Sequence, residues 1–149
     1  MKPFPLKPLL DLSKARLDDA TRSLGELIAK ENEGHRKLVM LQEYRAEYQS
    51  RFEEAARAGM GPDAWRNYAA FLSRIDEAIA VQTAQVAQSH TRTAMGKQSW
   101  MHERNRSKAF HSLHDRHLAD EMRKLAKSEQ RQADEHSANR HRARQGETD

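Results

Sequence analysis

The stretches LVMLQEYRAEYQSRF (residues 38–52) and WRNYAAFLSRIDEAI (residues 65–79) lie on either side of the short segment GMGP (residues 59–62). Both stretches carry apolar residues three and four positions apart, the spacing that lines one face of an α-helix. Gly59 is suited to end a helix and Pro62 to begin one, because glycine accepts the C-terminal cap conformation and proline the first turn. The sequence therefore predicts two helices that fold back on each other at residues 59–62.

A heptad repeat extends the pattern along both helices. The first helix is expected over about residues 8–58, and the second, over about residues 63–137, is apolar on its inner face as far as Val86 and weaker afterwards. Antiparallel pairing sets together positions whose numbers sum to about 120, which places Glu31 beside Ser89. This polar layer either fixes the alignment of the helices or lies at the solvent edge.

These patterns predict an all-α fold, a long antiparallel two-helix coiled-coil hairpin that forms a single domain over residues 1–149. The first helix runs out near Pro8, so the second is expected to lose its partner near Ser112. A disordered basic tail is expected over about residues 138–149.

Composition agrees with a thin contact line between helices. Of the 149 residues, 37% are hydrophobic and 32% charged, too little apolar material for a thick core. The absence of cysteine excludes disulfides and thiolate chemistry, and no run approaches the roughly 20 apolar residues of a membrane span. We therefore expect a soluble, intracellular protein.

The net charge of +4, with acidic residues interspersed among basic ones, favours acidic protein partners or a solvated tail over nucleic acid.

Catalytic and metal chemistry find little support. The sequence contains no glycine-rich phosphate loop, HExxH motif or Ser/His/Asp order, so we expect no catalytic residue, no enzyme activity and no cofactor. His111, His114 and His117 recur every three residues and could bind a metal only with a further ligand such as Glu121. Solvated histidines on a polar helix are the alternative, and we predict no metal site.

Aromatic residues gather on one flank of the predicted hairpin. Tyr44 and Phe71 occupy g positions beside the d residues Leu41, Tyr48 and Ile75. The rings either cover and broaden a thin core or form an exposed anchor for a partner, since aromatic side chains give a large contact area at low entropic cost.

The motif Leu41-x-x-Tyr44-x-x-x-Tyr48, a short glycine-containing gap, and the motif that begins Trp65-x-x-Tyr68-x-x-Phe71 resemble the flagellar export protein FliJ family. The resemblance covers about residues 6–110. It implies a cytoplasmic component of the bacterial flagellar type III export apparatus, similar to the central stalk of rotary ATPases. Its implied partners are the hexameric export ATPase, which receives the end with both termini, the cytoplasmic domain of the membrane export gate, and export chaperones.

The same resemblance implies a gate-binding surface and a location at the cytoplasmic face of the inner membrane. The residues carried over from the family are Lys37, Leu41, Tyr44, Tyr48, Phe71, Ile75, Ala78 and Gln82. Lys37 and Gln82 differ from the residues typical of the family at these positions. The alternative function is a cytosolic coiled-coil module whose basic C-terminal helix, with the cluster at residues 140–144, binds nucleic acid or an anionic surface.

Overall fold

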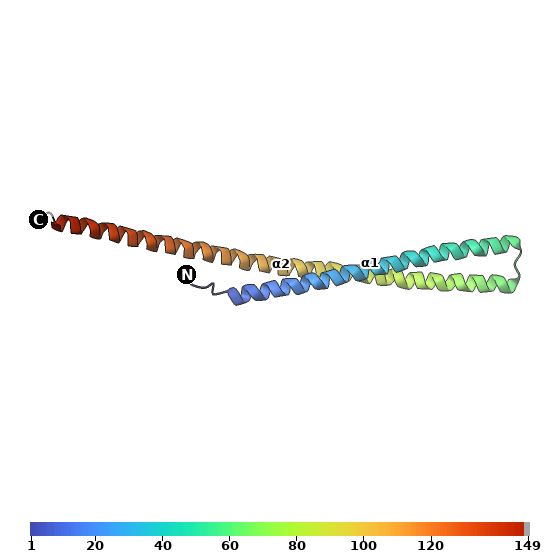
Figure 1. The fold of residues 1–149 in the computed structure, drawn as a ribbon. Helices are drawn as coiled ribbons and strands as arrows, with labels where there is room; N and C mark the ends of the chain where they lie inside the picture. Colours follow the sequence, from blue (N-terminus) through green and yellow to red (C-terminus); the bar gives the residue numbers. More distant parts are fainter. Residues whose placement is uncertain (148–149) are drawn as a thin grey trace. The chain divides into compact units, whose positions relative to one another are not determined.

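Two helices account for nearly all of the chain. In this computed structural model, which describes residues 1–147, α1 spans Lys7–Ala58 and α2 spans Pro62–Glu147. All regular secondary structure in the described residues is helical. Figure 1 shows the two helices running in opposite directions from the bend that joins them. The predicted all-α two-helix hairpin is confirmed.

The bend forms where glycine and proline interrupt the helical pattern. Gly59 has φ +103°, a conformation that L side chains rarely adopt, and its amide donates to the carbonyl of Ala56 at 3.3 Å. Pro62 opens α2, and the amide of Trp65 donates to the carbonyl of Gly61 at 3.0 Å. α1 ends at Ala58, the residue expected from the sequence, and α2 begins at Pro62, one residue before its expected start.

Packing divides the chain into two units. The bend unit comprises Asp18–His102, and the termini unit comprises Met1–Leu17 with the chain from Glu103 onward. Each unit contains a length of α1 and a length of α2. The expectation of a single domain stays a prediction.

The bend unit has an apolar core that follows the heptad. Leu72, Ile75 and Val86 are its buried apolar residues. The helices approach closely at Gly96, where a Cβ would lie 2.7 Å from Cδ1 of Leu27, so a larger residue would require the Leu27 side chain to move. The cross-helix contacts described below join positions whose numbers sum to about 120, as antiparallel pairing predicts.

The core of the termini unit is mixed. Leu10 is its buried apolar residue, whereas Ser13, Ser107 and Glu121 are buried polar residues. The hydroxyl of Ser13 donates to the carbonyl of Leu10 at 2.7 Å, so that side chain is satisfied within its own helix. The apolar pattern of the sequence weakens after Val86, and in the termini unit polar side chains accordingly occupy buried positions between the helices.

The segment before α1 continues the packing beyond the point expected from the sequence. The amide of Lys2 donates to Oε2 of Glu121 at 3.3 Å, and the carbonyl of Lys2 lies 2.9 Å from Nε2 of His117. Phe4 packs on His114 with ring centroids 5.2 Å apart. The prediction that α2 loses its partner near Ser112 is therefore wrong, because a non-helical segment still offers backbone groups and a ring for contact.

From Met122 to Glu147, α2 is exposed to solvent along its whole length. The helix continues through Glu147, so residues 138–147 differ from the disordered tail that the basic composition predicts; Thr148 and Asp149 lie outside the described residues. Alanine, glutamine and arginine favour the helical conformation. Side-chain pairs four residues apart also stabilise this part of α2, as where Nε2 of Gln130 donates to Oδ1 of Asp134 at 3.1 Å. No helix within residues 1–147 has an apolar stretch long enough to cross a bilayer.

Candidate functional site

Three aromatic side chains from both helices gather in the bend unit. The ring centroids of Tyr48 and Phe71 lie 4.6 Å apart, and the ring of Tyr44 stands edge-on to Phe71 at 6.3 Å with an interplanar angle of 79°. Tyr44 and Tyr48 are 6.4 Å apart on α1. These separations fall within the range of favourable aromatic pairs. We call Tyr44, Tyr48 and Phe71 the aromatic patch.

Exposure differs across the aromatic patch. Tyr44 is 46% exposed, whereas Tyr48 and Phe71 are half-buried. Burial raises the pKa of the Tyr48 hydroxyl, with Tyr68 and Tyr44 as lesser contributors. Tyr44 is therefore the ring that the patch presents to solvent. The half-buried rings of Tyr48 and Phe71 pack against it.

A second group of rings continues from the aromatic patch towards the bend. Phe52 packs on Trp65 at 4.8 Å and on Tyr68 at 5.4 Å, and Tyr68 also contacts Tyr48 at 5.3 Å. Trp65 is 52% exposed although it occupies an inner heptad position. These rings do broaden a thin core, as one of the two interpretations of the sequence holds, and they leave Tyr44 and Trp65 accessible.

The other residues of the predicted gate-binding surface fall into different environments. Leu41, Lys37 and Gln82 line a shallow groove of about 320 Å³ together with Met40. Ile75 is only 5% exposed and belongs to the core, and Ala78 is exposed. The structure therefore brings Leu41, Lys37 and Gln82 together at the surface and places Ile75 beneath it.

Met40 is a surface residue that was not among the site residues predicted from the sequence. It is 66% exposed and sits at a c position, which points away from the partner helix in an ideal coiled coil. Its place beside Leu41 makes it part of the same apolar surface. The signal available in the sequence was an isolated methionine next to an inner position, which is weak on its own.

A solvent-exposed ion pair links the two helices near the aromatic patch. Arg45 on α1 contacts Asp76 on α2 through its guanidinium group. The hydrogen bond that Arg45 donates lowers the pKa of Asp76. The same hydrogen bond raises the pKa of Arg45. Arg45 occupies an a position, and the heptad indicated its inward direction but not its partner.

Glu31 forms a second polar link between the helices. Its Oε1 lies 2.8 Å from Nδ1 of His90, and hydrogen bonds from His90 and then Thr93 lower its pKa. The partner is thus His90, next to the expected Ser89. With Glu31 bonded across the helix pair, the register-setting interpretation is better supported than the solvent-edge one.

A family model gives the chain its place among known proteins. The model described as "Flagellar FliJ protein" matches residues 1–146. The chain belongs to the FliJ family. FliJ proteins from Salmonella typhi and Escherichia coli K12 are 30% and 28% identical to it over 130 residues, which is 87% of this chain and 88% of each relative. The resemblance seen in the sequence is confirmed, and the chain is a component of flagellar protein export.

A solved structure shares the fold of this FliJ-family chain. It is described as a "putative YscO homolog" from Chlamydia trachomatis, and it superposes with a TM-score of 0.69. The match covers 97% of this chain and 98% of that one at 18% sequence identity. At that identity the likeness shows the fold alone.

The histidines of this FliJ chain that resembled a metal site have other contacts. His114 and His117 pack on the ring of Phe4, at 5.2 and 5.5 Å, while His111 is exposed. Within the described part of the chain, no three histidine or acidic side chains are placed to hold a metal ion together.

Proposed function

We propose that this FliJ-family chain is a stalk and adaptor of the flagellar type III export apparatus. In this proposal the termini unit enters the ring of the hexameric export ATPase, and the aromatic patch binds the cytoplasmic domain of the membrane export gate. The chain contributes no catalytic residue, associates with the inner membrane only through these partners, and has export chaperones as further partners. Family membership and the surface of the bend unit support it.

The observation that carries the proposal is the exposed ring of Tyr44. It stands on Phe71 from the other helix, so the helix pair holds it in position before any partner arrives. A preorganised aromatic side chain loses little conformational entropy on binding and buries a large area. Leu41 and Met40 extend the apolar surface on α1.

The termini unit offers a different kind of surface. Beyond Glu121, α2 has no covering segment in the described residues, and its polar side chains face solvent on all sides. This part of α2 is largely polar, with Met122 and Leu125 as exposed apolar side chains, and a largely polar helix needs a partner or many pairs along its own surface. Insertion into a ring of subunits would supply that partner.

The decisive experiment replaces the two patch residues of the g flank. Tyr44→Ala with Phe71→Ala should weaken binding of the isolated cytoplasmic gate domain, measured by calorimetry, by more than about 1 kcal/mol per residue. The thermal midpoint should fall, because Phe71 is half-buried against Tyr48, so binding is measured at a temperature at which circular dichroism shows the variant to be folded. The matched control is Val39→Ala with Val81→Ala, which removes two exposed apolar side chains elsewhere in the bend unit and should leave binding unchanged.

Two results would contradict the site assignment. Unchanged gate binding in the folded Tyr44→Ala, Phe71→Ala variant would show that the rings only cover the core. Binding that collapses steeply with added salt would favour the alternative of an anionic surface, since an aromatic contact depends weakly on ionic strength.

The ATPase half of the proposal is tested by shortening α2. Removal of the chain from Leu118 onward should reduce stimulation of the export ATPase and leave gate binding intact. Circular dichroism checks that the remaining chain is helical. Full stimulation by the shortened protein would rule out the end of α2 as the element that faces the ATPase.

A further inference from the structure

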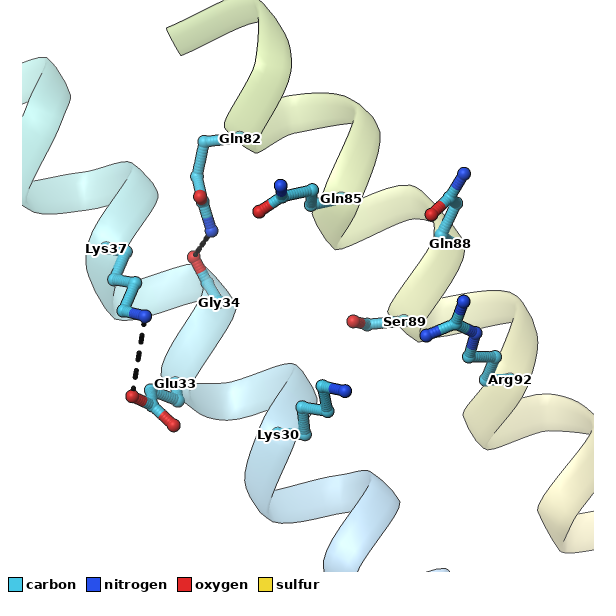
Figure 2. A pocket seen from close by; sticks show the side chains of 9 residues that line it. All are labelled: Lys30, Glu33, Gly34, Lys37, Gln82, Gln85, Gln88, Ser89 and Arg92. Carbon is cyan, nitrogen blue, oxygen red and sulfur yellow. Dashed lines mark hydrogen bonds and ion pairs between the residues drawn. The ribbon is translucent and has the colours of Figure 1, made fainter. Parts of the chain in front are cut away.

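A polar groove lies between residues 30–37 of α1 and residues 82–92 of α2 in the bend unit, with a volume of about 360 Å³ (Figure 2). Its origin is the small size of Gly34 and Ser89, which leave space that larger side chains fill elsewhere in the helix contact. Even a Cβ on Gly34 would meet only Val86 and Gln82, at 3.5 and 3.7 Å. These are ordinary van der Waals distances, so the space beside Gly34 has room for a group of about methyl size.

Positive charge exceeds negative charge along the groove. Lys30, Lys37 and Arg92 line it together with a single carboxylate, that of Glu33. Lys37 is paired with Glu33 at 3.6 Å, as Figure 2 shows. In the described part of the chain, Lys30 and Arg92 have no carboxylate partner. Two cations that face each other from different helices are thus left without a counter-charge.

The neutral lining can both donate and accept hydrogen bonds. Gln85 and Ser89 extend from α2 into the space between the helices, and Gln88 lies beside Arg92 (Figure 2). Gln82 is already engaged, since its Nε2 donates to the carbonyl of Gly34 at 3.0 Å. Amide groups of this kind match a peptide backbone, which carries both donors and acceptors.

We infer that this groove binds an acidic stretch of polypeptide, with carboxylates on Lys30 and Arg92 and the peptide backbone along Gln85 and Gln88. Charge complementarity and the amide lining favour this occupant. A DNA strand presents only acceptors along its backbone, and nucleic acids in general depend on many phosphate contacts, of which two unpaired cations offer few. The inference goes beyond gate binding by the aromatic patch, although Lys37 and Gln82 belong to both surfaces.

The test measures binding of a defined acidic peptide to the full chain. The probe is a fluorescein-labelled decapeptide of alternating glutamate and serine, followed by fluorescence anisotropy at low ionic strength, where charge pairing is least screened. The neutral control peptide replaces every glutamate by glutamine. The wild-type chain should bind the acidic peptide at least about tenfold more tightly than the neutral one.

Two protein variants locate the binding. Lys30→Gln with Arg92→Gln should weaken binding of the acidic peptide about tenfold, because both charge-assisted contacts are lost. The matched control, Lys14→Gln with Arg74→Gln, removes the same two charges from exposed positions outside the groove and should change binding less than about twofold. Ser89→Leu fills the groove at constant charge and should also weaken binding, which keeps the test valid if the double variant does not fold.

Three results would overturn the inference. The first is equal binding of the acidic and neutral peptides, or no binding of either. The second is an equal loss in the control variant, which would mean that only net charge matters. The third is competition by a thymidine decamer that displaces the peptide and binds as tightly as the peptide does. That result would mean that the groove binds anions in general. No export protein is used, so failure here leaves the proposed stalk and adaptor function standing.

Discussion

The two packed units fill the same heptad repeat with different chemistry. In the bend unit the buried positions include Leu72, Ile75 and Val86, with Thr93 as a buried polar residue, and aromatic side chains from both helices pack against one another. In the termini unit the buried positions include Ser13, Ser107 and Glu121. The difference shows that antiparallel pairing of two helices does not require an apolar residue at every inner position.

The chemistry of each unit sets how firmly its helices are held. Burial of a large apolar side chain contributes roughly 1.5–3 kcal/mol, whereas an intramolecular hydrogen bond contributes on average about 1 kcal/mol because water competes for it. The helices of the termini unit should therefore separate more easily than those of the bend unit. In the proposed function, the unit that holds the aromatic patch is the firmer one.

The largest expected effect comes from the apolar core of the bend unit. Ile75→Ala should lower the free energy of unfolding by about 2–4 kcal/mol, because it leaves a cavity in a position only 5% exposed. Urea unfolding followed by circular dichroism measures it. Ser13→Ala in the termini unit should cost less than about 1 kcal/mol, since its hydroxyl bonds within its own helix. Equal losses at the two positions would remove the contrast between the units.

A smaller effect is expected at the bend. Gly59→Ala should destabilise the hairpin by about 1–2 kcal/mol, because a Cβ is strained at φ +103° even though space is available around it. Gly61→Ala is the matched control, with open space and no positive φ, and should change the urea midpoint little. Similar midpoints for both variants would mean that the bend relaxes without a left-handed residue.

The smallest effect is local and depends on pH. The hydrogen bond from the amide of Lys2 is the main cause that lowers the pKa of Glu121, so the contact stabilises the charged carboxylate. A lowered folded-state pKa means that this stabilisation is complete above the ordinary glutamate value of about 4.3 and is lost as the pH falls through the lowered value.

The amide chemical shift of Lys2, followed by NMR, reports this contact directly. In the wild-type chain it should titrate at a pH below the ordinary glutamate pKa, and Glu121→Gln should abolish the titration. Glu129→Gln, at an exposed position of α2, should leave it unchanged. A Lys2 titration that persists in Glu121→Gln would show that another group holds the N-terminal segment.

The hairpin and its alignment could be predicted from residues close together in the sequence. Gly59 and Pro62 mark the bend because each has a backbone preference that acts locally, and the heptad fixes which positions face inward because helical periodicity does not depend on the partner. The same reasoning placed Tyr44 and Phe71 on one flank, and their rings do meet. Whether that flank binds the export gate stays a prediction.

What only the tertiary structure decided concerns contacts that no repeat encodes. Phe4 and Lys2 lie before the helix and outside any heptad, yet they extend the packing of α2 to Glu121. The groove beside Lys30 depends on two small residues, Gly34 and Ser89, that lie on different helices. Periodicity shows which way a side chain points, but the space and charge opposite it belong to a distant part of the chain. Those features arise only when both helices are in place.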